Sequence, residues 1–248
     1  NFRSAVINFI FHLVLLNQAF TVQSLQYFDT LISISAIEIK NNESEVSILM
    51  NLLEYIPNIL SYNSNFISSK NEEISNLIIY VTQRNDFPLF MKPIFSLLLE
   101  IIDFCFDSFA DLIYQLDIFR INISQWESTK DTSLQIIFLR MIHKFAERQI
   151  ISDSKDSDLS QICEFVFSFY HKPNDEMKKL SWITTFSLIQ SYSFCVSLFL
   201  SLGIVDQIIE ICQSDASYEN KKATVNVLFY LLVNNKEILN DDNYSVKL

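Results

Sequence analysis

The feature that most constrains this chain is its near-complete lack of glycine. Gly203 is the only glycine in a sequence of 248 residues, whereas ordinary usage of about 7% would supply roughly seventeen. Phosphate-binding loops, dinucleotide-binding turns and the nucleophile elbow of serine hydrolases each need several glycines within a short window. Tight hairpin turns also favour glycine, because it adopts positive φ without strain. The sequence therefore excludes these motifs and favours an all-α fold.

Apolar residues follow helical spacing wherever the sequence is periodic. Ile136, Leu139 and Ile142 lie along one helical stripe, as do Leu228 and Leu231. Half of the residues are hydrophobic, enough for a large core or a long continuous seam. Short polar clusters separate the apolar runs, and no long Gly/Pro/Ser linker divides them. We therefore expect a single helical domain over residues 1–248.

The last third of the chain contains an internal repeat. Residues 174–191 align without gaps on residues 217–234 at an offset of 43, and a fainter copy precedes them at an offset of 47, which places Ile136 on Ile183. The pattern predicts long helices near residues 131–147, 174–191 and 217–234, with shorter helices between them. Periods of 40 to 47 residues built from two or three helices are those of HEAT and armadillo arrays.

Residues 193–234 resemble an armadillo repeat. They read as a short first helix (SFCVSLFLSL), Gly203 at a turn, a second helix (IVDQIIEIC), a polar loop and a long third helix (KKATVNVLFYLLVN). The family commonly places a glycine between its first two helices. The resemblance is good over residues 193–234, fair from residue 131 and only architectural before that. It implies a right-handed α-solenoid of armadillo or HEAT type, with irregular repeats over 1–130, clearer repeats over 131–234 and a polar tail over 235–248.

In the armadillo family the third helices line a concave groove that binds other proteins. The family's third-helix asparagine is not matched here, so the resemblance does not imply recognition by an asparagine ladder. The residues that we predict to line such a groove are basic, with one tryptophan as a hydrophobic anchor: Arg140, Lys144, Lys178, Lys179, Trp182, Lys221 and Lys222. Stacked repeats would gather them into a basic strip that receives an acidic peptide or a phosphorylated tail. The alternative is that the lysines only solvate helix ends.

The net charge and the cysteines limit which kinds of partner and which cellular compartment we expect for this protein. The formal net charge is −11, from 29 acidic and 18 basic residues, which argues against nucleic acid or anionic membranes as partners. The apolar stretch over residues 5–16 is too short and polar to span a bilayer, and we interpret it as a first structural helix rather than a signal peptide. The cysteines lie within apolar runs and form no CxxC pair: Cys105, Cys163, Cys195 and Cys212. They predict reduced core thiols in a cytoplasmic protein.

One acidic row is the only candidate for metal chemistry. Asp103, Asp107 and Asp111 recur at i, i+4 and i+8, a spacing that would either hold a divalent metal or form a solvated helix face. The histidines have no partner at metal-binding spacing. We therefore expect no enzyme activity, cofactor or metal, and a non-catalytic interaction scaffold or adaptor. The alternatives are a structural segment of a larger cytoskeletal or trafficking assembly, including a homo-oligomer, and a metal-dependent helical enzyme that uses the aspartate row.

Overall fold

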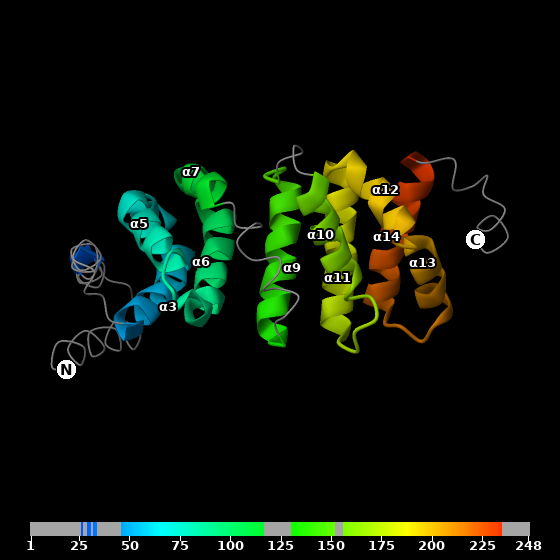
Figure 1. The fold of residues 1–248 in the computed structure, drawn as a ribbon, viewed down its shortest axis with the longest axis horizontal. Coiled ribbons are helices and arrows are strands. Elements are labelled where there is room, and N and C mark those ends of the chain that lie inside the picture. Colours follow the sequence, from blue (N-terminus) through cyan, green and yellow to red (C-terminus); the bar gives the residue numbers. More distant parts are fainter. Residues whose placement is uncertain are drawn as a thin grey trace. The chain divides into compact units, whose positions relative to one another are not determined.

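The computed structural model describes residues 46–116, 130–151 and 156–234, preceded by Gln26, Asp29, Thr30, Ile32 and Ser33. These residues form eleven α-helices and one 3-10 helix, with no strand in the described part (Figure 1). The predicted all-α fold is therefore confirmed. The predicted helix over residues 5–16 and the polar tail over 235–248 lie outside the described residues.

The internal contacts divide the chain into two compact units, Asn1–Asp117 and Ile118–Leu248. The sequence predicted a single domain over residues 1–248, meaning one unit that unfolds cooperatively. Cooperative unfolding is not visible in a structure, so the single domain stays a prediction.

The first unit pairs two long helices. Its elements are α3 (Val46–Tyr62), α4 (Ser64–Ser68), α5 (Asn71–Thr82), the 3-10 helix η1 (Phe87–Phe90), α6 (Met91–Phe104) and α7 (Phe106–Leu116). Helix α3 packs along α6, and α5 packs on α7. Leu52, Ile56, Ile94 and Ile101 are fully buried, as helical spacing of apolar residues requires.

The second unit contains the three long helices that the repeat predicts. Its elements are α9 (Thr132–Glu147), α10 (Asp156–Phe167), α11 (Asp175–Ser191), α12 (Ser193–Ser201), α13 (Ile204–Gln213) and α14 (Tyr218–Asn234). Helix α11 lies between α9 and α14 and packs on both (Figure 1). The shorter helices α10 and α12 both contact α11, and α13 packs on α14.

Polar side chains at equivalent repeat positions cap the N-termini of α9, α11 and α14. The Asp131 carboxylate accepts hydrogen bonds from the N–H groups of Ser133 (2.9 Å) and Leu134 (3.3 Å). The Asn174 amide oxygen accepts one from Met177 N–H at 3.0 Å. The Ser217 hydroxyl accepts one from Asn220 N–H at 3.3 Å. Each cap satisfies a free N–H group of the first helical turn.

These caps stand 43 residues apart, at positions 131, 174 and 217. The buried positions recur at the same interval, for example Phe145, Leu188 and Leu231. The offset of 47 predicted between the first two copies was therefore wrong. It differs from 43 by about one helical turn, which leaves almost the same face turned inward.

Two positive-φ residues end helices in this unit. Gly203 turns the chain between α12 and α13 with φ 84°, at the place that the sequence predicted. Gln149 has φ 54° after α9. Its N–H bonds to the Ala146 carbonyl at 3.1 Å, and the Ile150 N–H bonds to the Phe145 carbonyl at 3.0 Å, the pairing of a Schellman motif. Glutamine here occupies the position where glycine is usual.

Among the described residues, no single helix is both long enough and apolar enough to cross a membrane. Helices α12 and α13 meet that length and composition only as a pair, and the pair is bent by 69°.

Candidate functional site

The predicted basic side chains of α9 and α11 reach across to the next long helix. An Arg140 guanidinium nitrogen lies 3.1 Å from a Glu176 carboxylate oxygen, and the Lys179 ammonium lies 3.1 Å from Glu219. Both glutamates sit in the first turn of their helix. All four side chains are about half exposed. Each cation therefore bridges from one helix to the acidic start of the next.

A third cation is paired within its own helix. The Lys144 ammonium lies 3.7 Å from a Glu147 carboxylate oxygen. The predicted surface is therefore not a strip of one sign, because glutamates alternate with the lysines and the arginine. The hydrogen bond from Lys179, assisted by its charge, lowers the pKa of Glu219.

The neighbouring lysines do not share one face. Successive residues of an α-helix are turned by about 100° from each other, so Lys178 and Lys221 point away from the face of Lys179 and Lys222. Lys179 and Lys222 line the same hollow between α11 and α14. The set predicted as one strip is thus divided by helix geometry.

Trp182 lies in the core, which corrects its predicted role as a surface anchor. Its side chain has no exposed area, and its indole ring stacks on Tyr170 at 4.0 Å between ring centroids with an interplanar angle of 2°. Its indole N–H is buried without a hydrogen-bond partner. A side chain in this position cannot contact a partner protein while the unit stays folded.

Two hollows open along α11 and α14. The smaller has a volume of about 210 Å³, and its wall includes Lys179, Ile183, Phe186 and Asn226. The larger, about 720 Å³, lies at the carboxyl ends of the same helices. The edge-to-face contact of Phe186 with Tyr230, 6.0 Å between centroids, fixes the spacing of the two helices. Ile183 and Phe186 give the smaller hollow an apolar wall beside its charges.

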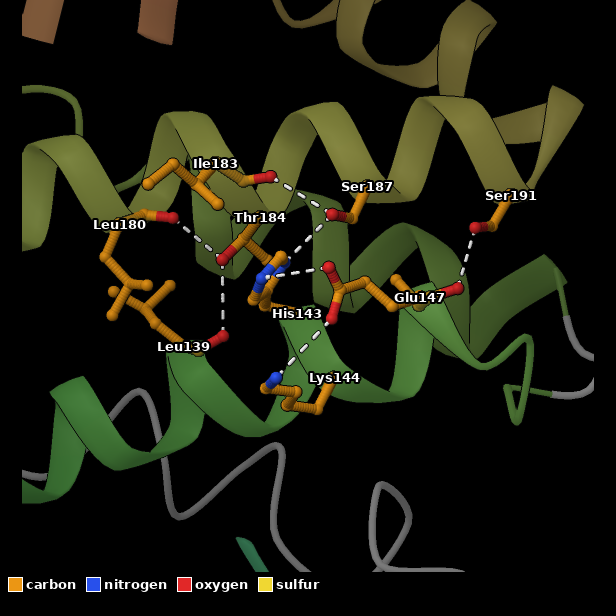
Figure 2. A network of polar contacts seen from close by, with 10 residues as sticks. Leu139, His143, Lys144, Glu147, Leu180, Ile183, Thr184, Ser187 and Ser191 are labelled. Carbon is orange, nitrogen blue, oxygen red and sulfur yellow. Dashed lines mark hydrogen bonds and ion pairs between the residues drawn. The ribbon is translucent and has the colours of Figure 1, made fainter. Parts of the chain in front are cut away.

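Sequence reasoning missed a polar seam between α9 and α11 (Figure 2). The Thr184 hydroxyl donates to the Leu139 carbonyl at 3.2 Å, and the Ser191 hydroxyl donates to the Ala146 carbonyl at 2.7 Å. His143 Nδ1 lies 2.9 Å from the Ser187 hydroxyl. The residues of this seam are 44 or 45 positions apart, so a fixed repeat register was the signal that could have found them.

The seam brings together serine, histidine and glutamate side chains. His143 Nε2 lies 3.5 Å from a Glu147 carboxylate oxygen, on the side opposite Ser187. Acyl transfer also needs N–H donors that point at a developing oxyanion. Ser187 is buried within α11, where backbone N–H groups bond to carbonyls of the preceding turn. These side chains therefore link two helices and give no support to nucleophilic chemistry.

The aspartate row does not lie on one helix, so that prediction was wrong. Helix α6 ends at Phe104 and α7 begins at Phe106, which leaves Asp103 on a different helix from Asp107 and Asp111. All three side chains are exposed, which agrees with the alternative that these aspartates are solvated. Within the described residues, no three His, Cys, Asp or Glu side chains gather into a group that could hold a metal ion.

The cysteines correct a further expectation. Cys105, Cys163 and Cys195 are buried free thiols, as predicted, but Cys212 is exposed near the end of α13. Burial raises the pKa of Cys105 to about 11. The Cys163 pKa is raised by a hydrogen bond with Cys195 and by burial. These two thiols are therefore protonated at neutral pH.

No protein-family model matches this chain, and no curated protein matches its sequence. A crystal structure of an engineered protein from the Northeast Structural Genomics Consortium is similar, with a TM-score of 0.59 and 11% sequence identity. The similarity covers 90% of this chain and 98% of that chain. At such low identity the likeness concerns the fold alone, and it agrees with the all-helical architecture.

Proposed function

We propose that this chain is a non-catalytic interaction scaffold, built as a right-handed α-solenoid of armadillo- or HEAT-like repeats. Its long helices begin at residues 46, 91, 132, 175 and 218, at intervals of 41 to 45 residues. The observation that carries the proposal is a repeated contact: His143 meets Ser187, and Phe186 meets Tyr230. Both members of the second pair lie 43 positions after those of the first. Stacking of equivalent units produces the extended surfaces on which solenoids bind partners.

The binding surface that we propose is the face shared by α9, α11 and α14. Arg140, Lys144, Lys179 and Lys222 supply its positive charge, and the hollow beside Ile183 supplies an apolar contact. Since glutamates already pair with three of these cations, a partner has to compete with them. A phosphorylated or strongly acidic protein segment does so, because it places more negative charge near each cation than one carboxylate. Preformed helices lose little entropy on binding.

The test uses two double variants with the same change in charge. Lys179→Glu with Lys222→Glu alters the proposed face, and Lys178→Glu with Lys221→Glu alters the adjacent positions that point away from it. Binding of a panel of fluorescent acidic, phosphorylated, neutral and basic peptides is measured by anisotropy. We expect the wild type and the second variant to bind acidic and phosphorylated peptides, and the first variant to lose them. Equal binding by both variants contradicts the proposed face.

A second candidate function is a structural segment of a larger cytoskeletal or trafficking assembly. It is favoured by exposed apolar side chains on α14, among them Phe229 and Val233, since such groups mark interaction surfaces. Sedimentation of the isolated chain distinguishes the two candidates, because a segment normally covered by neighbours self-associates when alone. The buried free thiols support the proposed cytoplasmic location.

A further inference from the structure

Helix α14 carries an exposed apolar stripe along its whole length. Tyr218 is 75% exposed, Val225 48%, Phe229 68% and Val233 56%. Their spacing of seven, four and four residues places them on one helix face, and Lys222, also exposed, lies among them. Several large apolar side chains exposed on one helix face mark a site of association.

The repeat relates this stripe to a surface that is covered in α11. At the 43-residue offset, Lys222 corresponds to Lys179 and Phe229 corresponds to Phe186. In α11 these two positions receive α14: Lys179 pairs with Glu219, and Phe186 packs on Tyr230. Lys222 and Phe229 therefore repeat the two positions by which α11 accepts α14.

The same arrangement occurs one step earlier, between α9 and α11. His143, which corresponds to Phe186, contacts Ser187, and Arg140 pairs with Glu176. Arg140 lies one helical turn after Ile136, the residue that corresponds to Lys179, so the glutamate keeps its repeat position and the cation does not. In both cases the arriving helix brings a glutamate in its first turn. The second contact residue of the arriving helix follows that glutamate by eleven positions: Ser187 follows Glu176, and Tyr230 follows Glu219. Eleven residues are about three helical turns, so both contact residues of the arriving helix lie on one face.

We propose that Lys222, Phe229 and Val233 form a docking site for an amphipathic helix of a partner protein. The partner helix carries a glutamate or aspartate in its first turn, which meets Lys222, and a large apolar residue eleven positions later, which packs on Phe229. It continues the row of α9, α11 and α14 by the contacts that already join them. This end-face site shares Lys222 with the face proposed above but takes its apolar contacts from Phe229 and Val233, which that face does not include. The Phe229→Ser variant therefore tests it separately from the function proposed for that face.

The probe is a fluorescent, end-capped peptide that copies residues 215–234, because that segment carries Glu219 and Tyr230 in the required spacing. It is titrated against the full chain by anisotropy. We expect saturable binding that Phe229→Ser weakens at least about tenfold, since the variant removes most of one aromatic contact. Leu89→Ser is the matched control, because Leu89 is 63% exposed in the first unit, and it should leave binding unchanged.

A charge exchange separates docking from a loss of structure. Lys222→Glu should weaken the wild-type peptide about two- to fivefold. A peptide carrying Glu219→Lys should bind this variant better than the wild-type peptide does. Circular dichroism checks that each protein variant keeps its helices. Rescue by the exchanged pair supports the direct contact with Lys222.

Three results overturn the proposal. The first is the absence of saturable binding by the wild-type chain. The second is binding that Phe229→Ser leaves unchanged, as expected if the peptide displaces α14 and binds α11 instead. The third is a wild-type dimer in sedimentation that Phe229→Ser dissociates, which assigns the stripe to a second copy of the chain.

Discussion

Truncation of Trp182 tests the placement of this residue in the core of the second unit. As a surface anchor, Trp182 would be replaceable by alanine with little effect on folding. In the structure it is fully buried and stacked on Tyr170. We therefore predict that Trp182→Ala strongly lowers the free energy of unfolding, and that Trp182→Phe has a much smaller effect.

The magnitude follows from two opposing contributions. A buried tryptophan removes about 150–250 Å² from water, which is worth about 4–6 kcal/mol at about 25 cal/mol per Å². Its indole N–H is buried without a partner, which costs about 1–3 kcal/mol. Trp182→Ala loses the first contribution and relieves the second, so we expect a net loss of about 3–4 kcal/mol. Trp182→Phe keeps a ring against Tyr170 and removes the N–H, so we expect a loss below about 1.5 kcal/mol.

The assay is urea unfolding followed by circular dichroism at the helical band. With a denaturant dependence of about 2 kcal/mol per M, the alanine variant should unfold at a urea concentration about 1.5–2 M lower than wild type. Tyr218→Ala is the control, because Tyr218 is 75% exposed, and it should shift the midpoint little. An alanine variant within about 0.5 M of wild type would refute the core placement. A phenylalanine variant as unstable as the alanine variant would refute the argument from the indole N–H.

Three further predictions follow. Gln149→Gly should raise the free energy of unfolding by about 1 kcal/mol, because glycine adopts φ 54° without strain, and calorimetry measures this; an unchanged or lower stability counts against it. Lys179→Met should raise the Glu219 pKa, since the Lys179 hydrogen bond lowers it. The stabilisation is therefore present above the unfolded pKa and lost as pH falls through the folded one, which NMR titration follows; an unmoved pKa contradicts the pairing. Cys212 should react with maleimide well before the three buried cysteines, as mass spectrometry of timed samples shows, and equal rates would contradict their burial.

The sequence was most informative where local physics decides the structure. The near absence of glycine and the helical spacing of apolar residues predicted an all-α chain. The boundaries expected for α9, α11, α12 and α13 agree closely with the structure. Such boundaries depend on capping side chains and turns within a few residues of the helix end. Gly203 illustrates this, because its predicted turn needs only its own positive φ.

The candidate site could be predicted only in part. Repetition and charge singled out Arg140, Lys179 and Lys222. In the structure Arg140 and Lys179 pair with glutamates of the next long helix, and Lys179 and Lys222 line one hollow. It turns Lys178 away from them by helix geometry, and it buries Trp182. Aspartates at i, i+4 and i+8 suggested one helix face, but the break at Cys105 divides them between two helices. A single sequence does not show where a continuous apolar run will bend.

The sequence by itself determined which segments are helical and which face of each helix is apolar. Only the tertiary structure decided the register, because a shift of about four residues turns a helix by slightly more than one full turn and leaves almost the same face inward. Offsets of 43 and 47 were therefore indistinguishable by periodicity. The burial of Phe145, Leu188 and Leu231 at equivalent positions shows an offset of 43, and the caps at the starts of the three helices agree with it. That register pairs Lys179 with Glu219 and Phe186 with Tyr230. These contacts depend on packing between helices distant in sequence, which local pattern does not encode.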